Sequence, residues 1–190
     1  MTPEAAHQFI RSRRSIFPRM YTSQPIEREI IEAILEDANW APTHKLTQPW
    51  RYKVLTGKAK NRLGDFLAET YKNTTPPEKF LPKKYEKTRD KCYRAACVML
   101  ICMQRDPARR VPEWEEVAAL ACSVQNMWLS CTAYGIGAYW SSSALRQYVG
   151  EFIDLEEGES CMGFFYMGYH EQAGKTHRSP ISEKVVWLEA

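Results

Sequence analysis

Hydrophobic residues recur along the chain at spacings that predict alternating helices and strands. Residues 25–39 repeat apolar side chains at intervals of three and four, which is typical of one helical face. Residues 50–56 alternate as in a half-buried strand, whereas residues 95–103 are apolar at both odd and even positions, which predicts a central strand covered on both faces. The longest periodic stretch, 112–134, has a proline at its start and Gly135 after its end, so we expect one long apolar helix there.

Shorter elements complete this order. We expect helices at 4–14 and 58–73 and strands at 135–140 and 161–169. Residues 74–82 predict an irregular excursion, followed by a mixed-charge stretch at 83–91, and together they suggest a mobile flap or a dimer arm. The whole pattern predicts an α+β fold, with helices packed on a mixed central sheet, in a single domain covering residues 1–190.

The composition narrows the functional classes. A net charge of +3, from 26 cationic and 23 anionic residues, is too mild to indicate a nucleic-acid partner. No stretch approaches a membrane span, and no apolar signal sequence begins the chain. The six cysteines form no C-x-x-C pair and have no histidine at ligand spacing, so we expect no metal site and a reduced, cytoplasmic setting.

The segment from Ala41 to Trp50 concentrates polar side chains between two prolines, at the point where a predicted helix gives way to a strand. The residue ahead of a proline is pushed out of the helical region, so the preceding helix should stop near Trp40. Loop donors in such a place are free to face a ligand, and His44 can donate or accept near neutral pH. A loop histidine bonded only to backbone explains His44 equally well.

Arg13, Arg14 and Ser15 place two guanidinium groups and a hydroxyl within three positions, which suits a phosphate monoester. A solvated basic helix end is the alternative. Gly135 and Gly137 alone are explained by a helix end followed by a strand. The chain shows neither a G-x-S-x-G motif nor a carboxylate pair, and no G-x-G-x-x-G opens a helix after the first strand. This absence of a nucleophile fits an enzyme whose cofactor carries the chemistry.

Together, the Arg-Arg-Ser triplet, the Ala-Pro-Thr loop ending in Gln-Pro-Trp and the late Gly-x-Gly turn resemble the nitroreductase family of flavoproteins. The resemblance runs from Arg11 to Trp187. It implies a homodimer with two FMN sites at the subunit interface, and helix 113–134 is our candidate for the core of that interface. It also implies that no side chain acts as a covalent catalyst.

The resemblance further implies which residues hold FMN. The N-terminal triplet and a late arginine match the phosphate and ribityl contacts of the family, His44 matches a contact made across the subunit boundary, and the triplet after Ala-Tyr matches contacts along the ring. The chain departs from its relatives at Leu46, where many have Asn, which removes one polar contact. It also departs at Ser141, where some have Arg, and the loss of this cation either weakens FMN binding or leaves the phosphate to Arg14 and Arg178. The implied cofactor-binding residues are Arg13, Arg14, Ser15, Trp40, His44, Trp140, Ser141, Ser142 and Arg178.

These features imply an FMN-dependent oxidoreductase that transfers hydride from NADH or NADPH to an electron-poor small molecule, such as a nitroaromatic or a quinone, by a ping-pong mechanism. Two alternatives stay open. A flavin-storage protein would have the same FMN-binding residues, but no face of the flavin ring would be open to substrates. Another flavin reaction, such as reductive dehalogenation or flavin fragmentation, would need a substrate lid, for which residues 74–94 are the candidate segment.

Overall fold

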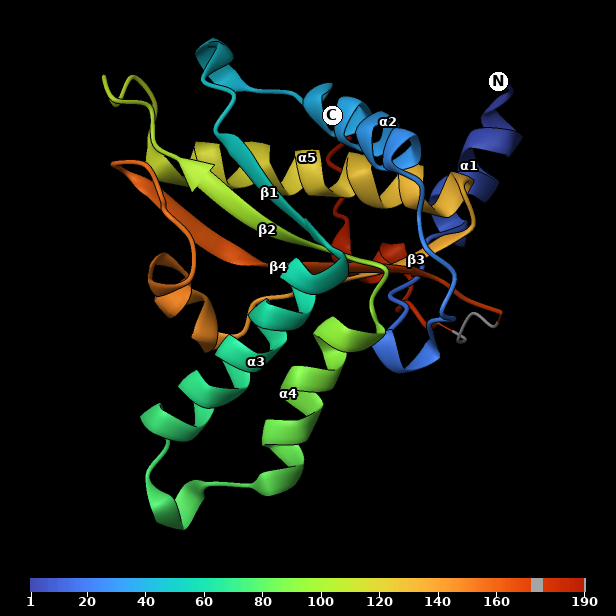
Figure 1. Ribbon diagram of the computed structural model, residues 1–190. Helices are drawn as coiled ribbons and strands as arrows, with labels where there is room; N and C mark the ends of the chain where they lie inside the picture. The colour runs from blue at the N-terminus through green and yellow to red at the C-terminus, as the bar shows by residue number, and fades with distance from the viewer. Residues whose placement is uncertain (172–175, 190) are drawn as a thin grey trace.

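A four-stranded sheet lies at the centre of the computed structural model, which describes residues 1–171 and 176–189 (Figure 1). The strand order is β1-β2-β4-β3, and all three ladders are antiparallel. The predicted α+β class is confirmed, but the expected mixed sheet is corrected, since parallel pairing among the described residues is limited to one bridge between Ser15 and Ala138. The strands are β1 (Trp50–Thr56), β2 (Cys97–Gln104), β3 (Ile136–Ser141) and β4 (Glu159–Tyr169).

Helices cover both faces of this sheet. Helices α2 and α5 pack together over one face, while α3 and the 3₁₀ helix η4 cover the other, and α3 and α4 extend away from the sheet as a pair (Figure 1). The α-helices are α1 (Pro3–Ser12), α2 (Arg28–Asn39), α3 (Gly57–Thr74), α4 (Pro82–Arg94) and α5 (Glu113–Ala133). The 3₁₀ helices are η1 (Pro18–Met20), η2 (His44–Leu46), η3 (Pro77–Lys79), η4 (Ala144–Glu151) and η5 (Ile181–Lys184).

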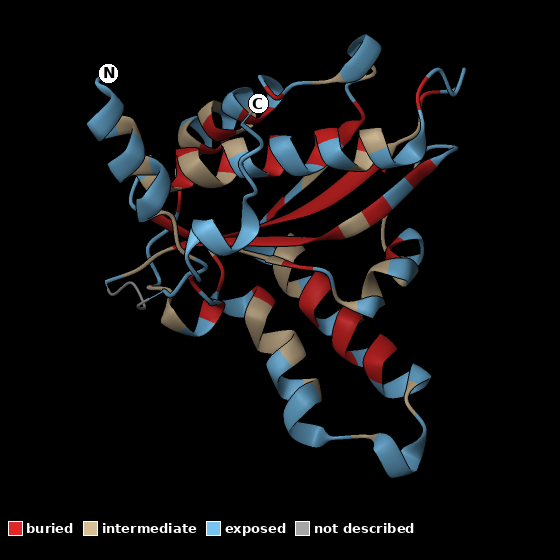
Figure 2. Ribbon diagram, turned by 180° about the vertical axis from the view of Figure 1, so that it is seen from behind, coloured by how far each residue is buried: buried red, intermediate tan, exposed pale blue. Residues whose placement is uncertain are grey.

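Strand β2 joins the two halves of the core. Because side chains alternate across a strand, Met99 and Ile101 enter a cluster with α2 and α5, whereas Val98 and Leu100 enter a second cluster with α3. Every residue of β2 except Gln104 is buried, which confirms the predicted central strand (Figure 2). Two separate apolar layers therefore hold the sheet in place.

The α3–α4 pair contains the element that the hydrophobic pattern missed. Residues 75–81 are irregular apart from η3, as expected, but the following mixed-charge stretch forms the 13-residue helix α4. Cys92 is the one fully buried residue of this helix, so it presents almost no apolar periodicity. A polar helix of this kind is stabilised by its contacts with α3.

Helix α5 has one buried face and one exposed face in the single chain. One face packs into the core through Leu120, Val124 and Met127. The other is exposed in the single chain, with Trp114 69% accessible and Ala121 open to solvent. Neither α5 nor any other helix in the described part of the chain is long and apolar enough to cross a membrane.

Candidate functional site

The N-terminal triplet lies beside strand β3. Helix α1 ends at Ser12 instead of continuing to residue 14, because the chain turns extended at Arg13 and pairs with the sheet. The backbone N–H of Ile16 donates to the carbonyl of Ala138 at 3.0 Å. This approach requires Gly137, since a Cβ there would lie 2.8 Å from Ile16 Cβ. The second glycine of the Gly-x-Gly turn is therefore needed to seat the arginine segment.

Three arginines gather at this edge of the sheet. Burial lowers the pKa of Arg13, and repulsion from Arg178 and Arg14 lowers it further, so the three guanidinium groups are close enough to interact. Arg14 donates to the carbonyls of Arg11 and Arg13, and Arg178 donates to Thr176 and to a neighbouring carbonyl. No ion pair joins these arginines to a carboxylate within residues 1–171 and 176–189. Such a cluster is suited to a ligand with concentrated negative charge.

Aromatic contacts connect this cluster to the end of β3. The Arg13 guanidinium lies 4.6 Å from the ring centroid of Trp128 on α5, and Trp128 meets Phe165 edge-to-face at 5.5 Å. Phe165 is the cross-strand partner of Trp140. The Trp140 indole N–H is buried without a hydrogen-bond partner in the described structure. An unpaired buried donor here is a second feature that favours a polar ligand at this edge.

The residues after Trp140 differ in exposure. Ser141 is buried at the end of β3, whereas Ser142 is exposed in the turn that follows. Ser143 caps η4, because its hydroxyl accepts from the backbone N–H of Leu145. The structure thus brings seven of the predicted site residues into one region, the arginine group: Arg13, Arg14, Ser15, Trp140, Ser141, Ser142 and Arg178.

The other predicted residues belong to a separate loop group, Trp40 and His44. Trp40 is 79% exposed, and its indole N–H donates to Glu36 one helical turn earlier. His44 Nδ1 lies 2.5 Å from a carboxylate oxygen of Glu115 at the start of α5. A carboxylate thus holds the imidazole, in place of the backbone partner considered from the sequence.

The loop around His44 adopts an unusual backbone. Lys45, Leu46 and Gln48 have positive φ angles of 51°, 51° and 42°, a region that residues other than glycine rarely occupy. Such conformations cost about 1–3 kcal/mol each and persist where the surroundings fix them. Lys45 donates to the carbonyl of Arg110, and Thr43 Oγ1 accepts from the Gln48 N–H. The loop is therefore held in a strained shape that raises His44 and Leu46 toward solvent.

The arginine group and the loop group lie near opposite ends of α5. Arg13 stacks on Trp128 and His44 bonds Glu115, positions that differ by 13 residues (128 − 115) on one helix. A helix rises 1.5 Å per residue, so the two anchor points are about 20 Å apart. One chain therefore does not bring all the predicted residues into one site.

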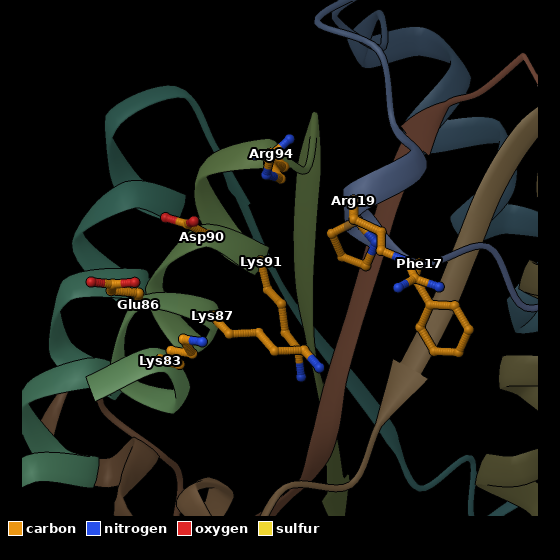
Figure 3. Close-up of a pocket in the computed structure, with 9 residues that line it drawn as sticks. Phe17, Arg19, Lys83, Glu86, Lys87, Asp90, Lys91 and Arg94 are labelled. Carbon is orange, nitrogen blue, oxygen red and sulfur yellow. The ribbon is translucent and has the colours of Figure 1, made fainter. Parts of the chain in front are cut away.

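The sequence analysis also missed a cavity of about 740 Å³ between η1 and α4, lined by Phe17, Arg19, Lys87 and Lys91 among others (Figure 3). The available signal was the spacing of four residues between Lys83, Lys87 and Lys91. That spacing places all three on one side of a helix, but α4 itself was not predicted.

Comparisons with known proteins agree with this fold. Residues 10–169 match the model of the nitroreductase family. The Bacillus subtilis protein YfhC, which bears the name of an NAD(P)H nitroreductase, is 29% identical over 181 residues, or 92% of this chain and 90% of that protein. The crystal structure of a nitroreductase-like family protein from Bacillus cereus superposes with a TM-score of 0.82 at 27% identity, covering 100% of this chain and 99% of the other.

A second crystal structure carries a cofactor. The protein from Desulfovibrio desulfuricans, named for the same family and solved in complex with FMN, superposes with a TM-score of 0.74 at 25% identity, covering 100% of this chain and 98% of the other. The fold and the match over most of the sequence define an oxidoreductase of the flavoprotein type. The chain belongs to the nitroreductase family.

Proposed function

We propose that the protein is an FMN-dependent oxidoreductase that takes hydride from NADH or NADPH and reduces an electron-poor small molecule, such as a nitroaromatic or a quinone. The observation that carries this proposal is the arginine group, in which three cations meet without a carboxylate among the described residues. The FMN in the related Desulfovibrio structure supports the choice of cofactor. One terminal phosphate fits the cluster, and the sequence lacks the fingerprint of a dinucleotide-binding fold.

Each residue of the arginine group has a distinct task in this proposal. Arg13, Arg14 and Arg178 hold the phosphate, and the Ser15 hydroxyl adds a hydrogen bond. The end of β3, from Trp140 to Ser142, lies along the ring system, where backbone N–H groups stabilise negative charge on a reduced ring. When bound, FMN supplies the acceptance of two electrons from the nicotinamide and their delivery to the acceptor. No side chain of the protein forms a covalent bond to substrate.

The active unit in this proposal is a homodimer of a single FMN-binding domain. Pairing two copies can bring the loop group of one chain to the arginine group of the other, which the separation of about 20 Å prevents within one chain. The outer face of α5 supplies a surface for this pairing, because Trp114, Ala118, Ala121 and Cys122 are exposed along it. The C-terminal segment adds Val186, Trp187 and Leu188, which are also exposed.

Two experiments test this function. The purified protein should show the absorbance of oxidised flavin, and the cofactor released by heat should run as FMN on chromatography. Anaerobic NADH or NADPH should bleach the flavin, and a quinone or nitroaromatic should restore its colour. A colourless protein would overturn the proposal, as would a yellow protein whose flavin neither nicotinamide reduces.

Steady-state kinetics test the order of events. Donor and acceptor use one site in turn in this proposal, so double-reciprocal plots at several fixed acceptor concentrations should give parallel lines. Intersecting lines would show that both substrates are bound together. That result would reject the alternating mechanism while leaving the flavin assignment intact.

A further inference from the structure

The cavity between η1 and α4 is large enough for a small-molecule ligand. Its volume of about 740 Å³ falls within the range of roughly 300–1,000 Å³ found for ligand pockets. One wall comes from the N-terminal segment after Ser15, and the other comes from α4 (Figure 3). The lining residues are Phe17, Pro18, Arg19, Lys83, Glu86, Lys87, Asp90, Lys91 and Arg94.

Positive charge dominates this cavity. Lys87 and Lys91 extend from α4 across the opening toward Phe17 and Arg19, whereas Glu86 and Asp90 lie on the side of the helix farther from η1 (Figure 3). No ion pair within residues 1–171 and 176–189 involves Lys87, Lys91 or Arg19. Like charges spaced four residues apart on a helix repel one another, so the protein keeps this stripe at a cost in stability. An anionic ligand would remove that repulsion.

The cavity also offers an aromatic surface. Phe17 is 41% exposed, and its ring centroid lies 4.7 Å from that of Tyr139 on β3. The Lys91 ammonium lies 5.8 Å from the Tyr139 ring, which in turn stacks on Tyr166 with an interplanar angle of 17°. The cations are therefore combined with an exposed π-surface, and this pairing suits a flat aromatic group bearing negative charge.

The position of the cavity relates it to the arginine group. Phe17 follows Ser15 by two residues, and Tyr139 and Trp140 are neighbours on the edge strand β3, with side chains on opposite faces of the sheet. A second cavity of about 570 Å³ shares Lys87 and Lys91 with the first and reaches Ser143, next to the exposed Ser142. The basic groove therefore runs along the end of β3, where the flavin ring lies in the proposed function.

We propose that this groove binds an aromatic anion, a ring with an attached carboxylate or phosphate, and holds it beside the flavin ring. The inference rests on the proposed function and specifies the substrate class of the same site. Two sources share this chemistry: an electron acceptor that carries a carboxylate, and the nicotinamide donor with its phosphates. Lys87 and Lys91 are specificity-determining residues because they contact the anionic group, not the group being reduced.

The test compares the double variant Lys87→Gln/Lys91→Gln with the matched control Lys58→Gln/Lys79→Gln, which removes the same charge from exposed positions outside the cavity. Anaerobic stopped-flow measurements follow flavin reduction by NADPH, and then reoxidation by 4-nitrobenzoate or by uncharged nitrobenzene. Removing two partly exposed charge contacts should weaken binding of the anionic ligand roughly threefold to thirtyfold. The rates with nitrobenzene should stay within about twofold of the wild type.

The reduction and reoxidation measurements distinguish an anionic acceptor from the nicotinamide donor as the ligand of the groove. A selective loss with 4-nitrobenzoate assigns the groove to the acceptor, and a selective loss with NADPH assigns it to the donor. Equal losses with 4-nitrobenzoate and nitrobenzene, with NADPH unaffected, would overturn the proposal, and so would a variant that behaves like its control. Lys87→Arg/Lys91→Arg should restore selectivity, because it keeps the charge.

A binding measurement separates failure of this inference from failure of the proposed function. Isothermal titration calorimetry of 4-nitrobenzoate against nitrobenzene requires no electron transfer and works on protein of any flavin content. A colourless protein that still prefers the anion, and loses that preference in the double variant, would reject the oxidoreductase but retain the anion site. A yellow, active protein that shows no charge preference in either binding or kinetics would do the reverse.

Discussion

The two ends of helix α5 carry chemically opposite surroundings. At the Trp128 end, three arginines meet beside β3 with no carboxylate among the described residues to neutralise them. At the Glu115 end, the polar groups are already satisfied, because His44 bonds Glu115 and Lys45 bonds a backbone carbonyl. The strain differs as well, since the positive φ angles gather in the loop at this second end.

This contrast indicates that the two ends of α5 have different roles in ligand binding. The unneutralised cations of the arginine group form a receiving surface, meaning an anion-binding surface that is stabilised when an anion binds. The loop around His44 is strained, and its polar groups already have hydrogen-bond partners. It forms a presenting surface, meaning a surface whose shape is fixed before the partner chain binds. In the proposed homodimer, the presenting surface of one chain meets the receiving surface of the other. The predictions below test this division, from the largest expected effect to the smallest.

Disrupting the proposed interface should have the largest effect. Ala121→Glu places a carboxylate on the exposed face of α5, and an uncompensated charge buried between two copies costs about 3–5 kcal/mol. We expect the variant to run as a monomer in light scattering at micromolar protein, with most of its FMN lost. Asn73→Glu, at an exposed position near the tip of α3, should stay dimeric. A dimeric Ala121→Glu protein with full FMN content would contradict the assigned surface.

Removing the central arginine should have the next largest effect. Arg13→Ala deletes a charge-assisted phosphate contact worth about 1.5–3 kcal/mol, so FMN affinity should fall roughly tenfold to a hundredfold. Lys58→Ala serves as the control, because this exposed lysine lies outside the site. Fluorescence titration of the cofactor-free proteins with FMN measures both affinities. Equal FMN affinities of the two variants would contradict the proposal that the arginine group binds the phosphate.

The loop group should contribute less, and a mixing experiment locates it. His44→Ala alone should weaken FMN binding about threefold to tenfold, as expected for one hydrogen bond. If each site combines Arg13 of one chain with His44 of the other, a mixed dimer of Arg13→Ala and His44→Ala chains contains one intact site and one doubly altered site. Half of its sites should then bind FMN as the wild type does. Mixed dimers in which both sites are weakened, one to the extent of Arg13→Ala and the other to the extent of His44→Ala, would place both residues of each site on the same chain.

Relieving the loop strain should have the smallest effect. Leu46 is exposed at φ 51°, a conformation that asparagine tolerates better than leucine. Leu46→Asn should therefore raise the free energy of unfolding by about 0.5–1 kcal/mol, measured by urea denaturation. Val54→Asn, at an exposed residue of strand β1 that does not have a positive φ, should give no gain. A destabilised Leu46→Asn variant would mean that the leucine side chain makes contacts that outweigh the strain.

Much of the fold could be predicted because its signals are local. The doubly apolar stretch at 95–103 predicted β2, and the periodic stretch at 112–134 predicted α5 nearly to its ends. Helix α4 was not predicted from the hydrophobic pattern, because it is polar on almost every side and depends on α3 for its stability. The first helix was predicted two residues too long, since pairing of Ser15 with Ala138 ends it early.

The sequence by itself determined the family and the types of residue available to bind a phosphate and a flavin. Short motifs and periodicity involve residues close together in the chain, so they can be recognised without the tertiary structure. The tertiary structure alone decided how these residues are grouped. It separated His44 from Arg13 by most of the length of α5, left Ala121 exposed and turned the α4 lysines toward Phe17. Periodicity shows which side of a helix is apolar or charged, but the partner that meets that side depends on contacts between segments far apart in the chain.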